Sequence, residues 1–218
     1  MTANEPQHEA PTFTATQPRE LVRALKAALV AAGAPHAERD QRFVRATVTG
    51  GSISVTGSDG ALLVRALGGA AEAWADIVDF VLPVSEVRQL VAFLGRGGTA
   101  RCWVDGPLLT VAFGFGVRDF GLAIPAQTHD LVMDAQLEEL VESDGAPIVN
   151  LTVRYAVARI ALQLRRISRL TATPGNLHIA NVQTRSTIRS AFTCAREDED
   201  PWLIGMYAAP AAEQTVLI

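Results

Sequence analysis

The sequence predicts an α+β fold made of repeated units, each with one strand, one helix and three further strands. Three observations carry this prediction: a helical pattern that follows a short extended stretch, glycine-rich turns between strand-like runs, and the return of the same order later in the chain. Because each helix must lay its apolar face on strands, paired units are expected to place helices on one face of antiparallel sheets.

The first unit begins near residue 12. Pro18 suits the first turn of a helix, and leucines recur from there at helical spacing until Gly33. Gly50-Gly51 and the turn at 57–60 separate three strand-like runs, as in hairpins. The predicted elements are a strand at 13–17, a helix at 18–33, and strands at 43–49, 52–56 and 61–67.

The second unit repeats this order. Pro83 ends an extended run, and Ser85 is the candidate N-cap of the helix that follows. Asp105-Gly106 predicts a hairpin turn. Gly114-Phe115-Gly116 is not followed by the helix that a phosphate-binding fingerprint requires, so we expect a bulge or turn there. The predicted elements are a strand at 77–82, a helix at 85–94, and strands at 100–104, 108–113 and 117–124.

The chain after Pro125 departs from the pattern. An extended stretch at 131–135 and a short helix at 136–142 are followed by no three-strand set, so this unit is expected to be shortened. A further full unit then predicts strands at 148–151, 170–173, 177–183, 187–195 and 202–208, with a helix at 153–169. The predicted division is a disordered tail at 1–11, a domain at 12–125 with two units, a shortened domain at 126–210 and a C-terminal tail at 211–218.

Composition narrows the class of protein. The 218 residues carry a net charge of -4, and the two cysteines, Cys102 and Cys194, belong to no Cys-x-x-Cys or Cys/His cluster. The sequence has no apolar run of the roughly 18 residues that a membrane helix needs, and its first dozen residues lack a signal-like apolar core. We therefore expect a protein of a reducing cytoplasm, without disulfide, metal or cofactor.

No set of residues predicts catalysis. The histidines stand alone in tail, loop or strand contexts, where a structural or surface role is the usual one, and the acidic run 197–200 has no complementary ligand set. We expect no enzyme activity. The histidines are His8, His36, His129 and His178.

Cationic residues gather on the outer faces of the predicted helices, although the chain is acidic overall. In the last helix, an apolar stripe formed by Val153, Val157, Ile160, Leu164 and Ile167 leaves the arginines on the outward side, and no acidic residue interrupts the segment. For each helix alone, a solvated face is the simpler interpretation. Together, three such faces on one side of the sheets would form a basic surface that follows phosphates without reading bases. The candidate phosphate contacts are Arg19, Arg23, Lys26, Arg88, Arg154, Arg159, Arg165 and Arg166.

Four segments carry a resemblance to a known family. They are PRELVRALKAAL, GSISVTGSDGALLVRA, FVLPVSEVRQLVAFL followed by VDGPLLTVAFGF, and VNLTVRYAVARIAL. In the order and spacing of its elements, the chain resembles the DNA polymerase sliding clamps, which include the bacterial beta clamps and the two-domain clamps of phages and archaea. The resemblance covers 12–125 and, more loosely, 126–210.

The resemblance implies a DNA clamp fold whose helices line the hole of a ring, with edge strands paired between subunits. It implies a processivity factor that encircles double-stranded DNA without sequence specificity and tethers a DNA polymerase or another client. A homo-oligomer is implied, and about two domains per chain favour a trimer. Clients would dock near a connector at 125–131, in a pocket formed by Leu122, Ile124, Met206, Tyr207 and Pro210.

Two departures from the family keep an alternative open. The third unit is shortened, and the C-terminal TVLI differs from the ending typical of the family. The alternative is a clamp-fold interaction or regulatory module that binds a protein or small ligand and does not encircle DNA. An enzyme on an unfamiliar α+β scaffold ranks last.

Overall fold

The computed structural model describes residues 13–33, 43–73, 77–94, 98–123, 151–170, 175–183, 187–195 and 200–210. The first unit is β1 (Phe13–Ala15), α1 (Pro18–Ala32), β2 (Phe43–Thr49), β3 (Ser52–Ser58) and β4 (Leu62–Ala73). The second is β5 (Ile77–Pro83), α2 (Val84–Phe93), β6 (Ala100–Asp105), β7 (Leu108–Phe113) and β8 (Gly116–Gly121). The last comprises α4 (Leu151–Ser168), β9 (Asn176–Gln183), β10 (Thr187–Ala195) and β11 (Leu203–Pro210).

The first two units exchange their first strands. The main path of the sheet runs β5-β2-β3-β4-β1-β6-β7-β8, so β5 completes the strands of the first unit and β1 completes those of the second. Both exchanged strands pair antiparallel, with Phe13 opposite Cys102 and Phe80 opposite Ala46. Neither unit therefore holds a complete sheet of its own.

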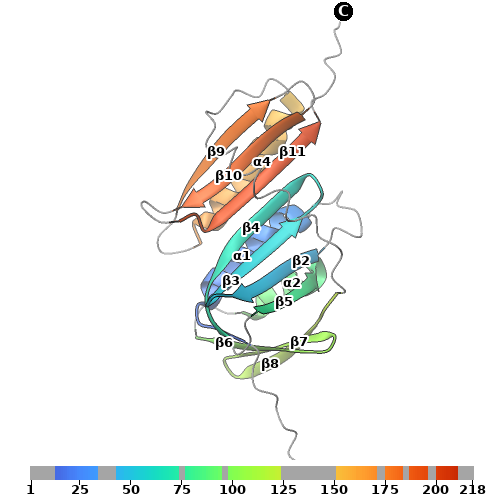
Figure 1. The fold of residues 1–218 in the computed structure, drawn as a ribbon, viewed down its shortest axis with the longest axis vertical. Helices are drawn as coiled ribbons and strands as arrows, with labels where there is room; N and C mark the ends of the chain where they lie inside the picture. The colour runs from blue at the N-terminus through green and yellow to red at the C-terminus, as the bar shows by residue number, and fades with distance from the viewer. Residues whose placement is uncertain are drawn as a thin grey trace, which may run out of the picture.

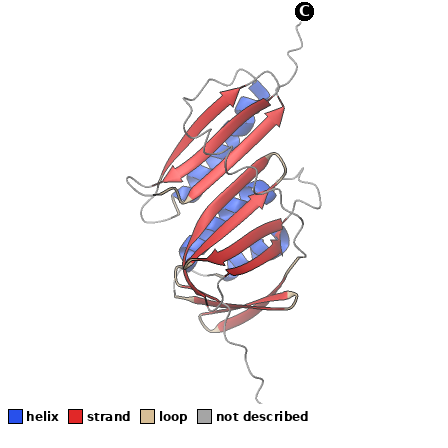
Figure 2. Ribbon diagram, viewed as in Figure 1, coloured by secondary structure: helices blue, strands red, loops and turns tan. Residues whose placement is uncertain are grey.

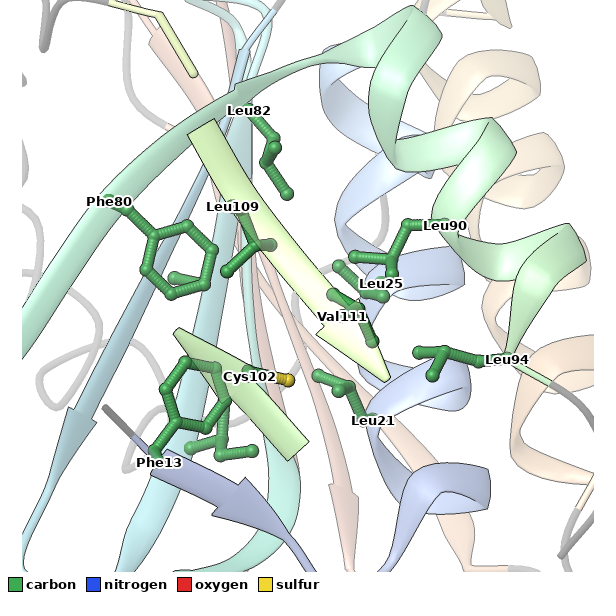
Figure 3. Close-up of a pocket in the computed structure, with 12 residues that line it drawn as sticks. Phe13, Leu21, Leu25, Phe80, Leu82, Leu90, Leu94, Cys102, Leu109 and Val111 are labelled. Atoms are coloured by element: carbon green, nitrogen blue, oxygen red, sulfur yellow. The ribbon is translucent and has the colours of Figure 1, made fainter. Parts of the chain in front are cut away.

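The core forms where the exchanged strands meet the helices. The rings of Phe13 on β1 and Phe80 on β5 stack with centroids 5.9 Å apart. Figure 3 shows these rings on one side of a small apolar cavity and leucines of α1 and α2 on the other. The cavity measures about 20 Å³, roughly the space of one water molecule, so it is a packing gap and not a ligand site.

The last unit joins the first through β4. Residues 62–66 of β4 pair antiparallel with 203–207 of β11, and β10 pairs with both β11 and β9. Two further bonds extend the junction: Leu67 N–H donates to the Trp202 carbonyl at 2.7 Å, and Ala208 N–H donates to the Ala61 carbonyl at 2.8 Å. The molecule is elongated, with α1 and α4 on the same side of the joined strands (Figures 1 and 2).

The α+β fold predicted from the sequence is confirmed, and most elements lie within a few residues of their predicted bounds. The turns at Gly50-Gly51, Asp105-Gly106 and Gly114-Phe115 are also confirmed. No helix in the described part of the chain is long and apolar enough to span a membrane.

One strand is longer than predicted. The pair Gly68-Gly69 resembles a turn, but β4 continues through it to Ala73. The register against β3 shifts between Ser52 and Ser54, which face Ala70 and Leu67, so β4 accommodates one extra residue as a bulge. Gly69 has a φ of 87°, and a Cβ there would lie 2.8 Å from a side-chain oxygen of Gln17, so glycine suits both the backbone and the space.

Helix starts were predicted less well. Ser85 is not an N-cap, because α2 begins at Val84 with Pro83 in the capping position and no side-chain capping bond. Leu151 was expected in a strand but is the first residue of α4, and Leu170 lies in a turn after it.

Several expectations fall outside the described residues. These are both tails, the connector at 125–131, the shortened unit, and the strand residues 148–150 and 171–173. The division into domains at residue 125 therefore stays a prediction.

The contact between α1 and β3 gives a stability prediction. A Cβ on Gly57 would lie 2.3 Å from the Ala28 carbonyl oxygen, whereas one on Gly121 would meet nothing within 4 Å. We expect Gly57→Ala to lower the free energy of unfolding by about 1–3 kcal/mol, because backbone must move. Gly121→Ala should change it by less than about 0.5 kcal/mol. Urea unfolding measures both; equal effects would contradict the close approach of α1 to β3.

Candidate nucleic-acid interface

A basic groove lies between α1 and α4. It is open to solvent, has a volume of about 420 Å³, and brings together side chains more than 120 positions apart in the sequence. Three of its lining residues, Lys26, Arg159 and Arg166, are cationic, and none is acidic. The remaining lining residues are Leu29, Val30, Gly33, Gln163 and Ile167.

The apolar stripe of α4 sets the direction of its arginines. Val153, Val157 and Leu164 are buried, and Ile160 and Ile167 pack partly buried against the same core, as predicted. A helix that buries this side must present the opposite side to solvent. The arginines that are exposed on it are Arg154, Arg159, Arg165 and Arg166, followed by Arg169 in the turn after the helix.

Charge on α4 is uncompensated within the helix, because the segment from Leu151 to Ser168 contains no acidic residue. A contrasting case is Arg45, which points away from the helices because its neighbours Val44 and Ala46 are buried in the core. Arg45 Nε donates to Asp79 at 2.9 Å, and this guanidinium holds the pKa of the Asp79 carboxyl below its ordinary value. The α4 arginines are thus better placed than Arg45 to attract an anion.

Of two other predicted cations, Arg88 lies next to the groove, whereas Arg19 lies on α1 before the groove-lining residues 26–33. Arg19 is exposed in the first turn of α1. Arg88 is exposed on α2, and one of its terminal nitrogens lies 3.6 Å from the position that a Cβ on Gly33 would take. That position is the C-terminal end of α1, where the helix dipole favours a positive charge.

Arg23 is a correction. Arg23 was expected on the outer, cationic face of its helix with Arg19 and Lys26, but it is only 5% exposed. Its Cζ lies 3.8 Å from the centroid of the Trp202 ring, and it forms an ion pair with Glu20. The prediction was wrong because Trp202 stands at the start of β11, and nothing near α1 in the sequence shows that β11 packs there.

The predicted client pocket is also corrected. Leu122 follows β8, and its N–H donates to the Pro107 carbonyl at 2.7 Å. Met206 and Tyr207 lie on β11, opposite Leu63 and Leu62 of β4. Figure 1 shows β8 and β11 in opposite parts of the molecule, so Leu122 does not share a pocket with Met206 and Tyr207. Ile124 and the side chain of Pro210 lie outside the described residues.

The described residues offer little for catalysis. None of their His, Cys, Asp and Glu side chains gather in a group of three that could hold a metal ion. Burial raises the pKa of the Cys102 thiol to about 12 and also raises that of Cys194, which disfavours the reactive thiolates. His178 is exposed on β9.

Sequence reasoning missed some residues of this face. Gln163 and Gly33 line the groove, and Leu151, Tyr155 and Leu162 are exposed on α4. The helical spacing of the last three is visible in the sequence, and it marks a second apolar row on the side of the helix opposite the core.

Comparison with solved structures shows which known fold this chain shares. No protein-family model and no curated protein sequence matches the chain. Among solved structures, the DNA polymerase III beta chain of Streptococcus pneumoniae superposes with a TM-score of 0.56 at 13% identity, covering 98% of this chain and 67% of that one. The Helicobacter pylori beta clamp in complex with carprofen gives 0.58 at 10% identity, covering 96% and 69%. The fold is that of a DNA sliding clamp.

A third match supports the clamp fold. The beta subunit from the DNA polymerase of Streptococcus pyogenes gives a TM-score of 0.56 at 13% identity, covering 97% of this chain and 68% of that one. In all three comparisons the chain spans about two thirds of the other protein. At such low identity the likeness shows the clamp fold alone.

The corrected position of Arg23 can be tested. Arg23→Met keeps much of the side chain's bulk but removes the guanidinium from Trp202 and Glu20. We expect it to lower the free energy of unfolding by about 1–3 kcal/mol and to leave DNA association unchanged. Arg154→Met, at an exposed position, should cost less than about 0.5 kcal/mol. Urea unfolding measures both free energies, and an equal loss of stability in the two variants would contradict the burial of Arg23.

Proposed function

We propose that this protein is a sliding clamp or clamp-like processivity factor, which holds duplex DNA against α1 and α4 and tethers a polymerase or another client. The observation that supports this most is the groove in which Lys26, Arg159 and Arg166 converge from two distant helices. In this proposal the protein works in the cytoplasm, has no enzyme activity and needs no cofactor.

The chemistry of the groove fits phosphates better than bases. Lys and Arg neutralise phosphate charge and release counterions, which gives affinity without sequence information. Base reading usually requires an element that enters a groove of the duplex. Here α1 and α4 pack along the strands, so they form a broad face and neither helix projects far enough to enter a groove of the duplex (Figure 2).

A closed ring around the duplex would keep the protein on DNA even when individual phosphate contacts break. In the proposed assembly, copies of the chain close a ring with the helices inward, and edge strands pair between neighbours. Among the described strands, β5, β8 and β9 each pair with one strand. Ala123, just after β8, bridges Val81 of β5, which leaves β8 itself and β9 as candidate edges. A chain that spans about two thirds of a beta clamp favours a trimer.

The phosphate contacts predict a charge-reversal effect. Arg159→Glu combined with Arg166→Glu should weaken association with duplex DNA and lower the slope of log affinity against log salt by about 2, because two phosphate contacts are lost. The fold should remain, since both side chains are exposed. Fluorescence anisotropy at several salt concentrations measures the effect.

A matched control reverses the same amount of charge elsewhere. Arg101 and Arg189 neighbour the core residues Cys102 and Ile188, so strand alternation directs them away from the helices. Arg101→Glu combined with Arg189→Glu should change DNA affinity far less. If both double variants weaken DNA association equally, the groove is not the contact face.

The proposed ring predicts the mass of the protein in solution and a difference between circular and linear DNA. Light scattering well above micromolar concentration should give the mass of a trimer, and the protein should remain on closed circular DNA while sliding off linear DNA. A strict monomer, indifferent to the topology of the DNA, would overturn the ring. That outcome would favour the clamp-fold interaction module.

A further inference from the structure

The outward side of α4 carries large apolar side chains between its arginines. Leu151, Tyr155 and Leu162 are 76%, 71% and 51% exposed. They follow at i, i+4 and i+11, which places them within about 40° of one another around a helix. Ala158, also exposed, falls between them. We call these four residues the α4 stripe.

Single exposed hydrophobic residues are ordinary on protein surfaces, but an aligned row is less so. The stripe spans 12 residues of helix, a rise of about 17 Å. It is separate from the apolar side of α4 that packs on the core, because Val153, Val157 and Leu164 are buried. α4 thus has one apolar side for the core and a second that faces solvent.

Two cationic rows border the stripe. By helical geometry, Arg159 and Arg166 lie on the flank that faces the groove, and Arg154 and Arg165 lie on the other flank. All four side chains are exposed, and α4 has no acidic residue. A complementary surface would therefore have an apolar row with carboxylates on both sides.

We propose that the α4 stripe docks an amphipathic helix of a partner protein, with leucine-like side chains on the stripe and Asp or Glu on both flanks. Helix-in-groove recognition uses this arrangement of apolar anchors at helical spacing. Opposite charges on the flanks fix the partner's orientation and speed its association.

Charge decides between this occupant and others. A second copy of α4 on the stripe would bring cationic rows together at close range, which costs free energy. The phosphates of duplex DNA can pair with the arginines, but they offer no apolar surface that could cover Leu151 and Leu162. An acidic, amphipathic partner satisfies both the stripe and its flanks, and on α4 it would compete with duplex DNA.

The experiment uses the full chain and a designed probe. The probe is an 18-residue fluorescent peptide with leucine at heptad a and d positions and glutamate at most others, and its control has lysine in place of glutamate. We expect the acidic peptide to bind in the micromolar range by anisotropy and the basic one not to bind. Tyr155→Ser with Leu162→Ser, or Arg154→Glu with Arg165→Glu, should each weaken binding at least tenfold.

Two comparisons keep the result specific. Leu108→Ser with Val117→Ser removes two exposed apolar residues far from α4 and should leave peptide binding unchanged. The Tyr155→Ser, Leu162→Ser variant keeps every cation, so it should also keep its DNA association. Failure of this proposal is thus distinguishable from failure of the proposed DNA contact.

Other outcomes overturn the proposal. Peptide binding that is absent, or equal in the stripe variants, shows that the stripe is no docking site for an acidic helix. Loss of self-association in the Tyr155→Ser, Leu162→Ser variant assigns the stripe to a second copy. Residues 124–150 contain six acidic residues and no Lys or Arg. If this segment covers the stripe, the full chain will not bind the peptide. Tyr155→Ser will then lower the free energy of unfolding of the chain in the absence of any peptide.

Discussion

Antiparallel pairing between β4 and β11 is the constraint on which the helix face depends. It joins two strands about 140 positions apart, and α4 packs on β9 and β10 behind that junction. This pairing and the direct contact between α1 and α4 together hold Arg159 and Arg166 beside Lys26. The position of the groove therefore depends on the register between β4 and β11. Its positive charge comes from the residues of α1 and α4 that remain exposed to solvent.

The junction is reinforced by a buried cation. Arg23 lies over the ring of Trp202, whose backbone carbonyl accepts a bond from Leu67 on β4. A guanidinium stacked on an indole keeps favourable electrostatics while both groups leave water. α1, β4 and the residue before β11 thus meet at Trp202, and Arg23 stabilises this junction instead of facing solvent.

Local signals accounted for much of the fold. Glycine turns and apolar periodicity predicted the strands and helices of the first two units, because hairpins and amphipathic helices depend on neighbours in sequence. The bulge at Gly68-Gly69 was missed because two glycines serve a turn and a bulge equally well. The burial of Arg23 and the separation of Leu122 from Met206 depend on long-range pairing, which spacing along one helix or one strand does not encode.

The exchange of β1 and β5 has a consequence for synthesis of the chain. The first three-strand set, β2 to β4, has left the ribosome before β5 is available to pair with β2, and β1 waits still longer for β6. During that interval the apolar sides of α1 and of these strands lack their final cover. Such exposed surface and unpaired strand edges make a folding chain prone to aggregation. Slow translation between residues 73 and 105 would therefore lengthen the interval in which the chain can aggregate.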